Sequence, residues 1–137
     1  MIRVLVVDDH DFLRGCLVDL IAATPDLVVV GECRDGSEVV AAVRSARPDL
    51  VLMDVRMGTR SGLDALADLQ REQLLARVVM LTSASAVTHR PLAESLGAVG
   101  YLQKGADCQQ VLEAVRRVAR GGTAWPEDLV GSTAAHG

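Results

Sequence analysis

Five short apolar runs alternate along this chain with segments in which apolar residues recur at every third or fourth position. The runs are Ile2 to Val7, Leu27 to Val30, Leu50 to Met53, Val78 to Leu81 and Val99 to Leu102. Short runs of this kind, rich in β-branched residues, predict buried strands. The longer segments between them have the spacing of helices that bury one face.

The helical segments and their ends complete a repeating pattern. Apolar residues recur with helical spacing in residues 13–21, 39–43, 63–69 and 111–118. Prolines follow the first two segments, and two glycines follow the last. The first and third strands are apolar on both faces, as expected for parallel strands covered by helices above and below. With right-handed crossovers, the chain is predicted to be an α/β protein, a (βα)5 doubly wound parallel sheet in the order 2-1-3-4-5.

A proline interrupts the segment that should form the fourth helix. Inside a helix, Pro91 would leave a gap in the hydrogen-bond ladder and clash with a carbonyl one turn earlier, at a cost of about 3 kcal/mol. In the first helical turn this cost disappears, because the N–H there has no partner within the helix. We therefore predict a short fourth helix from near Arg90 to Gly97, preceded by an extended or irregular loop over residues 83–89.

Length and composition fit one domain with an aliphatic core. The chain has 137 residues, of which half are apolar and only Phe12, Tyr101 and Trp125 are aromatic. Its net charge of -4 lacks the basic face that nucleic-acid backbones require, which argues against direct binding of DNA or RNA. No apolar stretch approaches the roughly 18 residues of a membrane span, and the first run is too short for a signal peptide. We therefore expect a cytoplasmic protein without membrane contact.

The cysteines and the tail carry no predicted chemistry. Cys16, Cys33 and Cys108 are widely spaced and form no CxxC pair, so we interpret them as buried thiols and not as disulfide or zinc residues. After Gly121 the chain loses its apolar periodicity and becomes small and polar. We therefore divide it into a domain over residues 1–120 and a linker or C-terminal tail over residues 121–137.

Polar side chains stand directly after four of the predicted strands. Asp8 and Asp9 follow the first strand, Asp54 the third, Thr82 the fourth and Lys104 the fifth. In an open parallel sheet, ligands bind beyond the carboxyl ends of the strands where the winding reverses, here between the first and third strands. We therefore expect the three aspartates to converge there.

Three converging carboxylates need a cation, because their repulsion would otherwise raise their pKa values. Mg²⁺ prefers hard oxygen ligands and typically joins carboxylates to a substrate phosphate. The hydroxyl of Thr82 and the ammonium of Lys104 suit phosphoryl oxygens. Lys104 is also the only lysine beside thirteen arginines. The combination predicts phosphoryl transfer.

Each of these residues also has a simpler structural explanation. The acidic pair could cap the first helix, although two carboxylates exceed what one cap needs. Asp54 could begin a turn, and Thr82 is at home in a strand, where Ser83 could supply the same hydroxyl. His10 resembles a metal ligand, but we interpret it as a neutral residue at the start of the helix.

These segments resemble the receiver domains of two-component response regulators over residues 1 to about 120. VLVVDDH is similar to their acidic-pair motif, DLVLMDVRM to their phosphoacceptor strand, VVMLTS to their hydroxyl-bearing strand, and GAVGYLQK to their tyrosine and lysine segment. DDH, GYLQK and the tail ARGGTAWPEDL most resemble the NarL/FixJ subfamily, in which a LuxR-type helix-turn-helix follows the receiver. The resemblance implies a flavodoxin-like receiver fold, with the output domain absent from this chain.

The resemblance implies a signalling switch and assigns residues to it. Asp54 would accept a phosphoryl group from a sensor histidine kinase, Thr82 and Lys104 would hold the phosphoryl oxygens, and Thr82 and Tyr101 would be the switch residues. Phosphorylation would strengthen a homodimer, and DNA would be reached only through an output domain. The domain would be no enzyme beyond its own phosphorylation and dephosphorylation.

The resemblance also implies the metal ligands. Mg²⁺ would be bound directly by Asp9 and Asp54, through water by Asp8, and by the backbone carbonyl of Arg56. Here the chain departs from the family, which usually has Met-Pro-Gly where this sequence has Met57-Gly58-Thr59. Because proline stiffens the backbone, we expect a more mobile loop.

Other functions on the same fold remain alternatives at this level. A flavodoxin-like FMN protein would need a phosphate-binding loop after the first strand, where the acidic pair would repel phosphate. A haloacid dehalogenase type phosphatase would need a DxDxT stretch, which is absent. A single-domain or atypical receiver that acts only as a protein interaction module is the third alternative.

Overall fold

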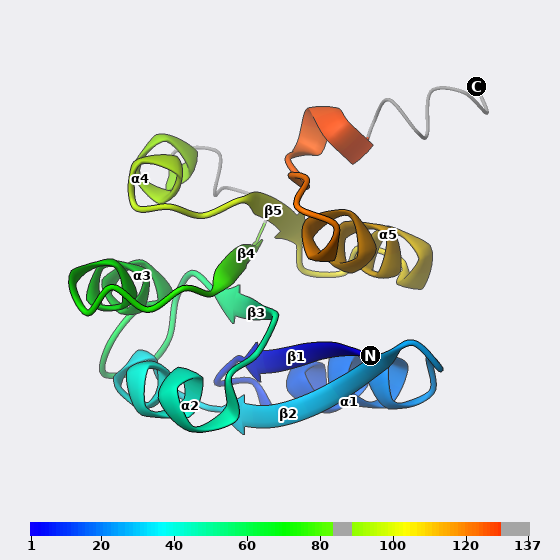
Figure 1. The fold of residues 1–137 in the computed structure, drawn as a ribbon, viewed down its shortest axis with the longest axis horizontal. Helices are drawn as coiled ribbons and strands as arrows, with labels where there is room; N and C mark the ends of the chain where they lie inside the picture. The colour runs from blue at the N-terminus through cyan, green and yellow to red at the C-terminus, as the bar shows by residue number, and fades with distance from the viewer. Residues whose placement is uncertain (84–88, 130–137) are drawn as a thin grey trace.

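The computed structural model of the chain describes residues 1–83 and 89–129. Its elements are β1 (Ile2–Val7), α1 (Asp11–Ala22), β2 (Leu27–Cys33), η1 (Gly36–Glu38), α2 (Val39–Ala46), β3 (Leu50–Asp54), α3 (Gly62–Arg71), β4 (Arg77–Thr82), α4 (Arg90–Ser95), β5 (Gly100–Gln103) and α5 (Cys108–Ala119). All strand pairs are parallel, and the order is β2-β1-β3-β4-β5 (Figure 1). The predicted α/β fold is confirmed.

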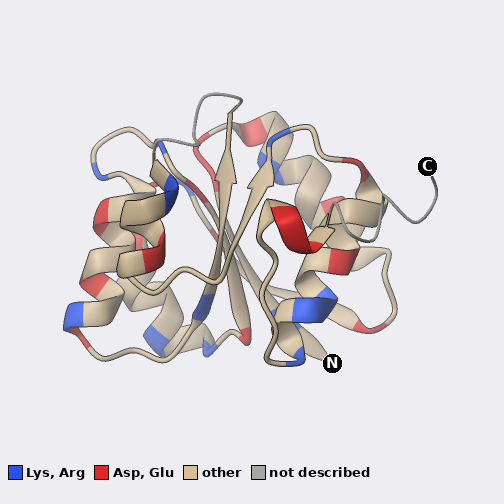
Figure 2. Ribbon diagram, turned by 90° about the horizontal axis from the view of Figure 1, so that it is seen from above, with Lys and Arg blue, Asp and Glu red and all other residues tan. Residues whose placement is uncertain are grey.

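Two aliphatic cores hold the helices against the two faces of the sheet. Successive strand residues point to opposite faces, so Leu5 and Val7 pack toward α2, α3 and α4, whereas Val4 and Val6 pack toward α1 and α5. Figure 2 shows the sheet between these two layers of helices. Burial on both faces explains why the first and third apolar runs do not alternate. Within the part of the chain that the structure describes, no helix is long and apolar enough to cross a membrane.

The register of the sheet brings the carboxyl ends of three strands together. Val7 of β1 pairs with Met53 of β3, and Asp54 pairs with Leu81 of β4. The residues that follow these strands therefore share one end of the sheet, as the sequence predicted.

The prediction that all three cysteines are buried is wrong for two of them. Cys33 is buried at the end of β2, but Cys16 and Cys108 are exposed. Cys16 lies beside the buried stripe of α1, which includes Ile21. Cys108 is the first residue of α5, and the buried face of that helix begins only at Val111.

The fourth helix has the start that its proline predicted. It begins at Arg90, and Pro91 lies in its first turn. Its end is also close to the prediction, because Gly97 follows with a φ of 98°, a backbone conformation that glycine adopts without strain. Most of the predicted loop before this helix, residues 84–88, lies outside the described residues.

Residues 123–129, which we expected to belong to a linker or tail, pack against the edge strand β5. Ala124 forms a parallel bridge with Gly100. Trp125 joins the core on the α2–α4 side, and Leu129 joins the core on the α1–α5 side. The segment therefore wraps around the free edge of the sheet. Helical periodicity could not predict this packing, because the buried residues contact different layers.

Candidate functional site

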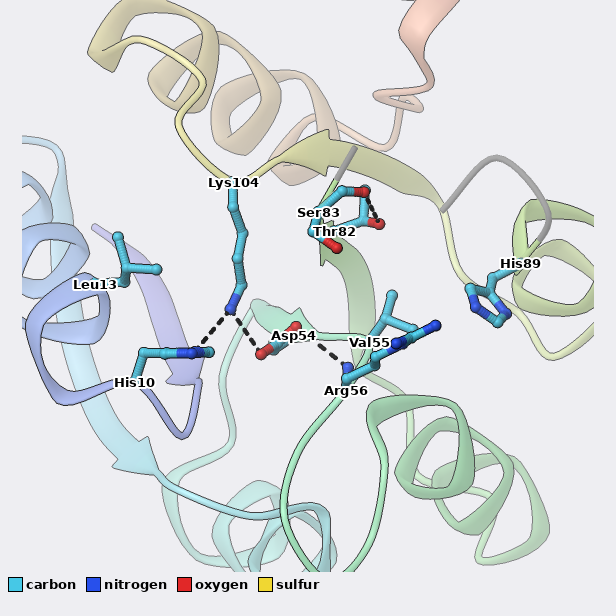
Figure 3. A pocket seen from close by; sticks show the side chains of 9 residues that line it. All are labelled: His10, Leu13, Asp54, Val55, Arg56, Thr82, Ser83, His89 and Lys104. Carbon is cyan, nitrogen blue, oxygen red and sulfur yellow. Dashed lines mark hydrogen bonds and ion pairs between the residues drawn. The ribbon is translucent and has the colours of Figure 1, made fainter. Parts of the chain in front are cut away.

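A cavity of about 310 Å³ lies at the carboxyl end of β3. Figure 3 shows the side chains that line it, which are those of His10, Leu13, Asp54, Val55, Arg56, Thr82, Ser83, His89 and Lys104. Lys104 and Asp54 point toward each other, and His10 approaches from the side of β1 (Figure 3). The cavity thus collects residues from the ends of several strands, as expected for a site where the winding reverses.

Asp54 and Lys104 form the central contact of this cavity. Asp54 closes β3 and is only 4% exposed. The Nζ of Lys104 donates to Oδ2 of Asp54 at 2.7 Å, and it lies 3.3 Å from Oδ1 of Asp8. One ammonium group therefore faces two buried carboxylates.

The pKa shifts of Asp54 and Lys104 indicate that the carboxylates of this site are only partly neutralised by the lysine. Burial raises the pKa of the Asp54 carboxyl above its usual value, although the hydrogen bond and charge of Lys104 oppose this. Burial alone would lower the pKa of Lys104, but the hydrogen bond and charge of Asp54, together with Asp8, raise it. A second cation would relieve the remaining repulsion between the carboxylates.

The acidic residues form a cluster that fits a hard divalent cation. One ligand atom from each of Asp8, Asp9, His10 and Asp54 lies within 4.8 Å of the others. Asp8 is 1% exposed, and its Oδ2 accepts no hydrogen bond from any described residue, although the Nζ of Lys104 lies 3.3 Å away. A buried oxygen without a hydrogen bond is costly unless another partner takes it. Because Mg²⁺ prefers carboxylate oxygens, these residues fit the predicted metal.

His10 lies at the start of α1, directly before its first residue, but its ring also faces the acidic cluster. It is the N-cap residue, and its side chain makes no cap hydrogen bond. Its Nδ1 lies 3.2 Å from Oδ1 of both Asp8 and Asp9. Meanwhile Oδ1 of Asp8 accepts the backbone N–H of His10 at 2.9 Å. Oδ1 of Asp8 therefore contacts both the backbone before α1 and Lys104, whereas Oδ2 accepts no hydrogen bond from the described residues.

The structure brings both candidate hydroxyl residues, Thr82 and Ser83, to the cavity. Thr82 is buried at the end of β4, and its hydroxyl donates to the backbone carbonyl of Ser83 at 2.9 Å. Tyr101 is not among the lining residues of this cavity. Its ring is buried against that of Trp125, with 6.0 Å between the centroids, and its hydroxyl has no hydrogen-bond partner among the described residues.

Two residues that the sequence analysis did not select support the site. Arg14 is buried and donates to the backbone carbonyl of Asp8 at 2.7 Å. Asp35 accepts hydrogen bonds from the backbone of Thr59 and Arg60, in the loop that follows Asp54. In the sequence, the position of Arg14 on the buried face of the predicted first helix was the signal that could have indicated a structural role for it. No local sequence pattern indicated the role of Asp35, because its hydrogen-bond partners lie 24 and 25 residues away along the chain.

This fold and this site together define the receiver class of signalling domain. The sheet order places the winding reversal between β1 and β3, and the acidic cluster and its lysine lie there. The sequence matches the response regulator receiver domain over residues 4–116, and the chain belongs to this family. Family membership sets aside the FMN protein and the phosphatase that the fold alone allowed.

Curated relatives are response regulators from several bacteria. The chain is 38% identical over 121 residues to the response regulator GacA of Pseudomonas aeruginosa, covering 88% of this chain and 56% of that protein. It is 34% identical over 118 residues to the nitrate/nitrite response regulator protein NarL of Escherichia coli, covering 86% and 55%. The chain therefore spans about half the length of these relatives.

Solved structures confirm the receiver fold. The response regulator domain of Thermotoga maritima CheB superimposes with a TM-score of 0.81 at 32% identity, over 88% of this chain and 97% of that one. A LuxR-family two-component response regulator from Aurantimonas superimposes with a TM-score of 0.85 at 28% identity, over 98% and 96%. The resemblance to LuxR-type and NarL-type regulators is thus confirmed.

Proposed function

We propose that this chain is a phosphorylation switch in which Asp54 accepts a phosphoryl group with the help of Mg²⁺. The contact that carries this proposal is the one between Asp54 and Lys104, at 2.7 Å in a cavity that also receives Asp8. A buried carboxylate beside an ammonium and further carboxylates suits a nucleophile whose product is anionic. Asp9, Asp54 and the carbonyl of Arg56 would bind the metal directly, and Asp8 would bind it through water.

The transfer must bring an anionic phosphoryl group to the anionic carboxylate of Asp54. A carboxylate oxygen of Asp54 attacks phosphorus, and the bond from phosphorus to the donor's histidine nitrogen breaks as the new P–O bond forms. Bound Mg²⁺ would supply charge neutralisation at the phosphoryl oxygens. Lys104 would transfer its hydrogen bond from Asp54 to a phosphoryl oxygen, and the hydroxyl of Thr82 or Ser83 would donate to another.

Membership of the receiver family supports a proposal for the donor and the output. We propose a sensor histidine kinase as the donor and a transcriptional output domain, beyond this chain, as the receiver of the signal. Thr82 and Tyr101 would be the switch residues, and phosphorylation would strengthen a homodimer. Sedimentation velocity with and without a phosphoryl mimic tests the association.

The first experiment measures the mass of the intact protein after incubation with Mg²⁺ and acetyl phosphate or phosphoramidate. We expect one added phosphoryl group on the natural chain and none on Asp54→Asn, which keeps the shape of the residue but removes the nucleophile. Asp26→Asn is the matched control, because Asp26 is paired with Arg116 on the surface and should label normally. Equal labelling of Asp54→Asn would contradict the assignment. No labelling of the natural chain would favour the interaction-module alternative.

A further inference from the structure

The loop between β3 and α3 carries the Arg56 carbonyl that we assigned to the metal. This loop lacks the proline that is usual in the family, so its conformation depends on its other contacts. The two ends of the loop are joined by a hydrogen bond, in which the N–H of Gly62 donates to the carbonyl of Val55 at 2.9 Å. Its far part, Thr59 and Arg60, turns toward the loop that follows β2.

Asp35, in that second loop, holds the far part of the first. Its Oδ1 accepts the backbone N–H of Thr59 at 2.7 Å and that of Arg60 at 3.1 Å. Its Oδ2 accepts the N–H of Ser37 at 2.9 Å, so the same carboxylate also caps η1. One side chain therefore connects the start of a helix with a loop that lies more than twenty residues further along the chain.

Close backbone packing next to Asp35 adds a second connection between the two loops. The N–H of Gly36 donates to the carbonyl of Arg60 at 3.0 Å. A Cβ atom at Gly36 would lie only 2.5 Å from that carbonyl oxygen, so a larger residue would push the loops apart. The hydrogen bonds that Asp35 accepts, first from Ser37 and then from Arg60 and Thr59, hold the pKa of its carboxyl far below the usual range. The carboxylate is therefore charged at neutral pH, and each of its oxygens accepts backbone hydrogen bonds as an anion.

We propose that Asp35 is a positioning residue for the metal site, which replaces the missing proline by holding the β3–α3 loop in the conformation that binds Mg²⁺. It would not touch the metal itself. Its effect would pass through the loop to the Arg56 carbonyl, as residues behind metal ligands commonly do. This proposal rests on the proposed function, because it needs the Arg56 carbonyl to be a ligand.

The test compares Asp35→Ser with Asp49→Ser. Serine is also a good N-cap, so Asp35→Ser keeps an acceptor for Ser37 but is too short to reach the loop as well. Asp49 accepts the backbone N–H of Arg3 at 2.8 Å, beside the first residue of β3 and therefore at the opposite end of that strand from Asp54. Both variants lose a carboxylate that joins two segments, but only the first affects the β3–α3 loop.

The first readout is the equilibrium affinity for Mg²⁺, measured by calorimetry in the absence of a phosphodonor. We expect Asp35→Ser to bind Mg²⁺ about tenfold more weakly than the natural chain, and Asp49→Ser to bind it with unchanged affinity. The second readout is hydrogen exchange without metal, in which the amides of Thr59 and Arg60 should lose protection in Asp35→Ser alone.

The outcomes separate the two proposals. If Asp35→Ser is folded and binds Mg²⁺ as tightly as the natural chain, the positioning role is wrong. If both variants weaken Mg²⁺ binding equally, the effect is a general loss of stability, and the positioning role is also wrong. If the natural chain itself does not bind Mg²⁺, the proposed function fails, whatever the exchange of the loop shows.

Discussion

At the scale of single residues, the central feature of this protein is that one ammonium group faces two buried carboxylates. Lys104 is the cation that contacts the two buried carboxylates, Asp8 and Asp54. Its ammonium lowers the pKa of Asp54, although burial still outweighs this effect. We therefore expect the lysine to stabilise the site as well as to take part in its proposed chemistry.

We predict that Lys104→Met lowers the free energy of unfolding by about 3 kcal/mol at pH 8, because it leaves buried carboxylates without a partner. In the natural chain Asp54 already has a raised pKa, so the folded state binds more protons than the unfolded state and stability falls as pH rises through that pKa. Without Lys104 this pKa rises further. The decrease in the free energy of unfolding that Lys104→Met causes should therefore become smaller as the pH is lowered from about 8 to about 5.

Denaturant unfolding at several pH values measures this effect. Arg116→Met is the control, because it removes a cation from an exposed pair with Asp26 and should change the free energy of unfolding little at any pH. Added Mg²⁺ should restore part of the stability of Lys104→Met. A loss that stays constant between pH 5 and pH 8 would show that Lys104 does not act through the ionisation of these carboxylates.

At the scale of elements, α4 and the segment after α5 are joined through one arginine. Arg90, the first residue of α4, donates to Glu94 in the same helix at 2.8 Å and to Glu127 in the segment at 2.6 Å. Its guanidinium also lies 4.6 Å from the ring centroid of Trp125, a distance typical of a cation–π contact. Trp125 in turn covers Tyr101. Arg90 therefore links the first turn of α4 to the segment after α5.

We predict that Glu127→Ala makes Trp125 more accessible, because the ion pair that draws the segment toward α4 is lost. Trp125 is the only tryptophan of the chain, so quenching of its fluorescence by acrylamide reports this directly. Glu94→Ala is the matched control, since it also removes one carboxylate from Arg90 but leaves the pair with Glu127 intact. Both changes should leave the stability of the domain nearly unchanged, because exposed ion pairs contribute little. Equal quenching in both variants would mean that Glu127 does not hold the segment.

At the scale of the whole molecule, the segment over residues 123–129 closes an edge of the sheet. Such an edge offers unpaired backbone groups to other chains. The bridge between Ala124 and Gly100 pairs part of this edge, and Trp125 and Leu129 bury apolar surface on either side of it. The domain therefore uses a part of the chain beyond α5 to complete its fold.

We predict that a chain ending at Gly122 is less stable by about 3 kcal/mol, because full burial of each large apolar side chain contributes about 1.5 to 3 kcal/mol before the cost of ordering the segment. It should also associate more readily, since the edge of β5 is then uncovered. Thermal unfolding and sedimentation equilibrium measure the two effects. A truncated chain with unchanged stability would show that these contacts contribute little.

Much of this organisation could be predicted from the sequence because it depends on local pattern. Apolar runs and helical spacing predicted the elements of the sheet and its helices. Pro91 predicted the start of α4, since its conflict with a helix interior is independent of packing. The acidic residues and Lys104 were found because they follow strands, and parallel strands bring such residues to one end of a sheet.

The remaining features depend on contacts between residues that are distant in the sequence. Whether a cysteine on an amphipathic helix is exposed depends on how the helix is rotated against the sheet, which a repeat of three and four residues does not resolve. Asp35 has no local signal for its contact with Thr59, because only the packing of two loops brings its carboxylate to that backbone. By itself the sequence thus determined the fold and the charged groups at its site, through local spacing and strand direction. Only the tertiary structure decided how those groups are held, since hydrogen bonds between loops and packing across a sheet edge depend on three-dimensional proximity.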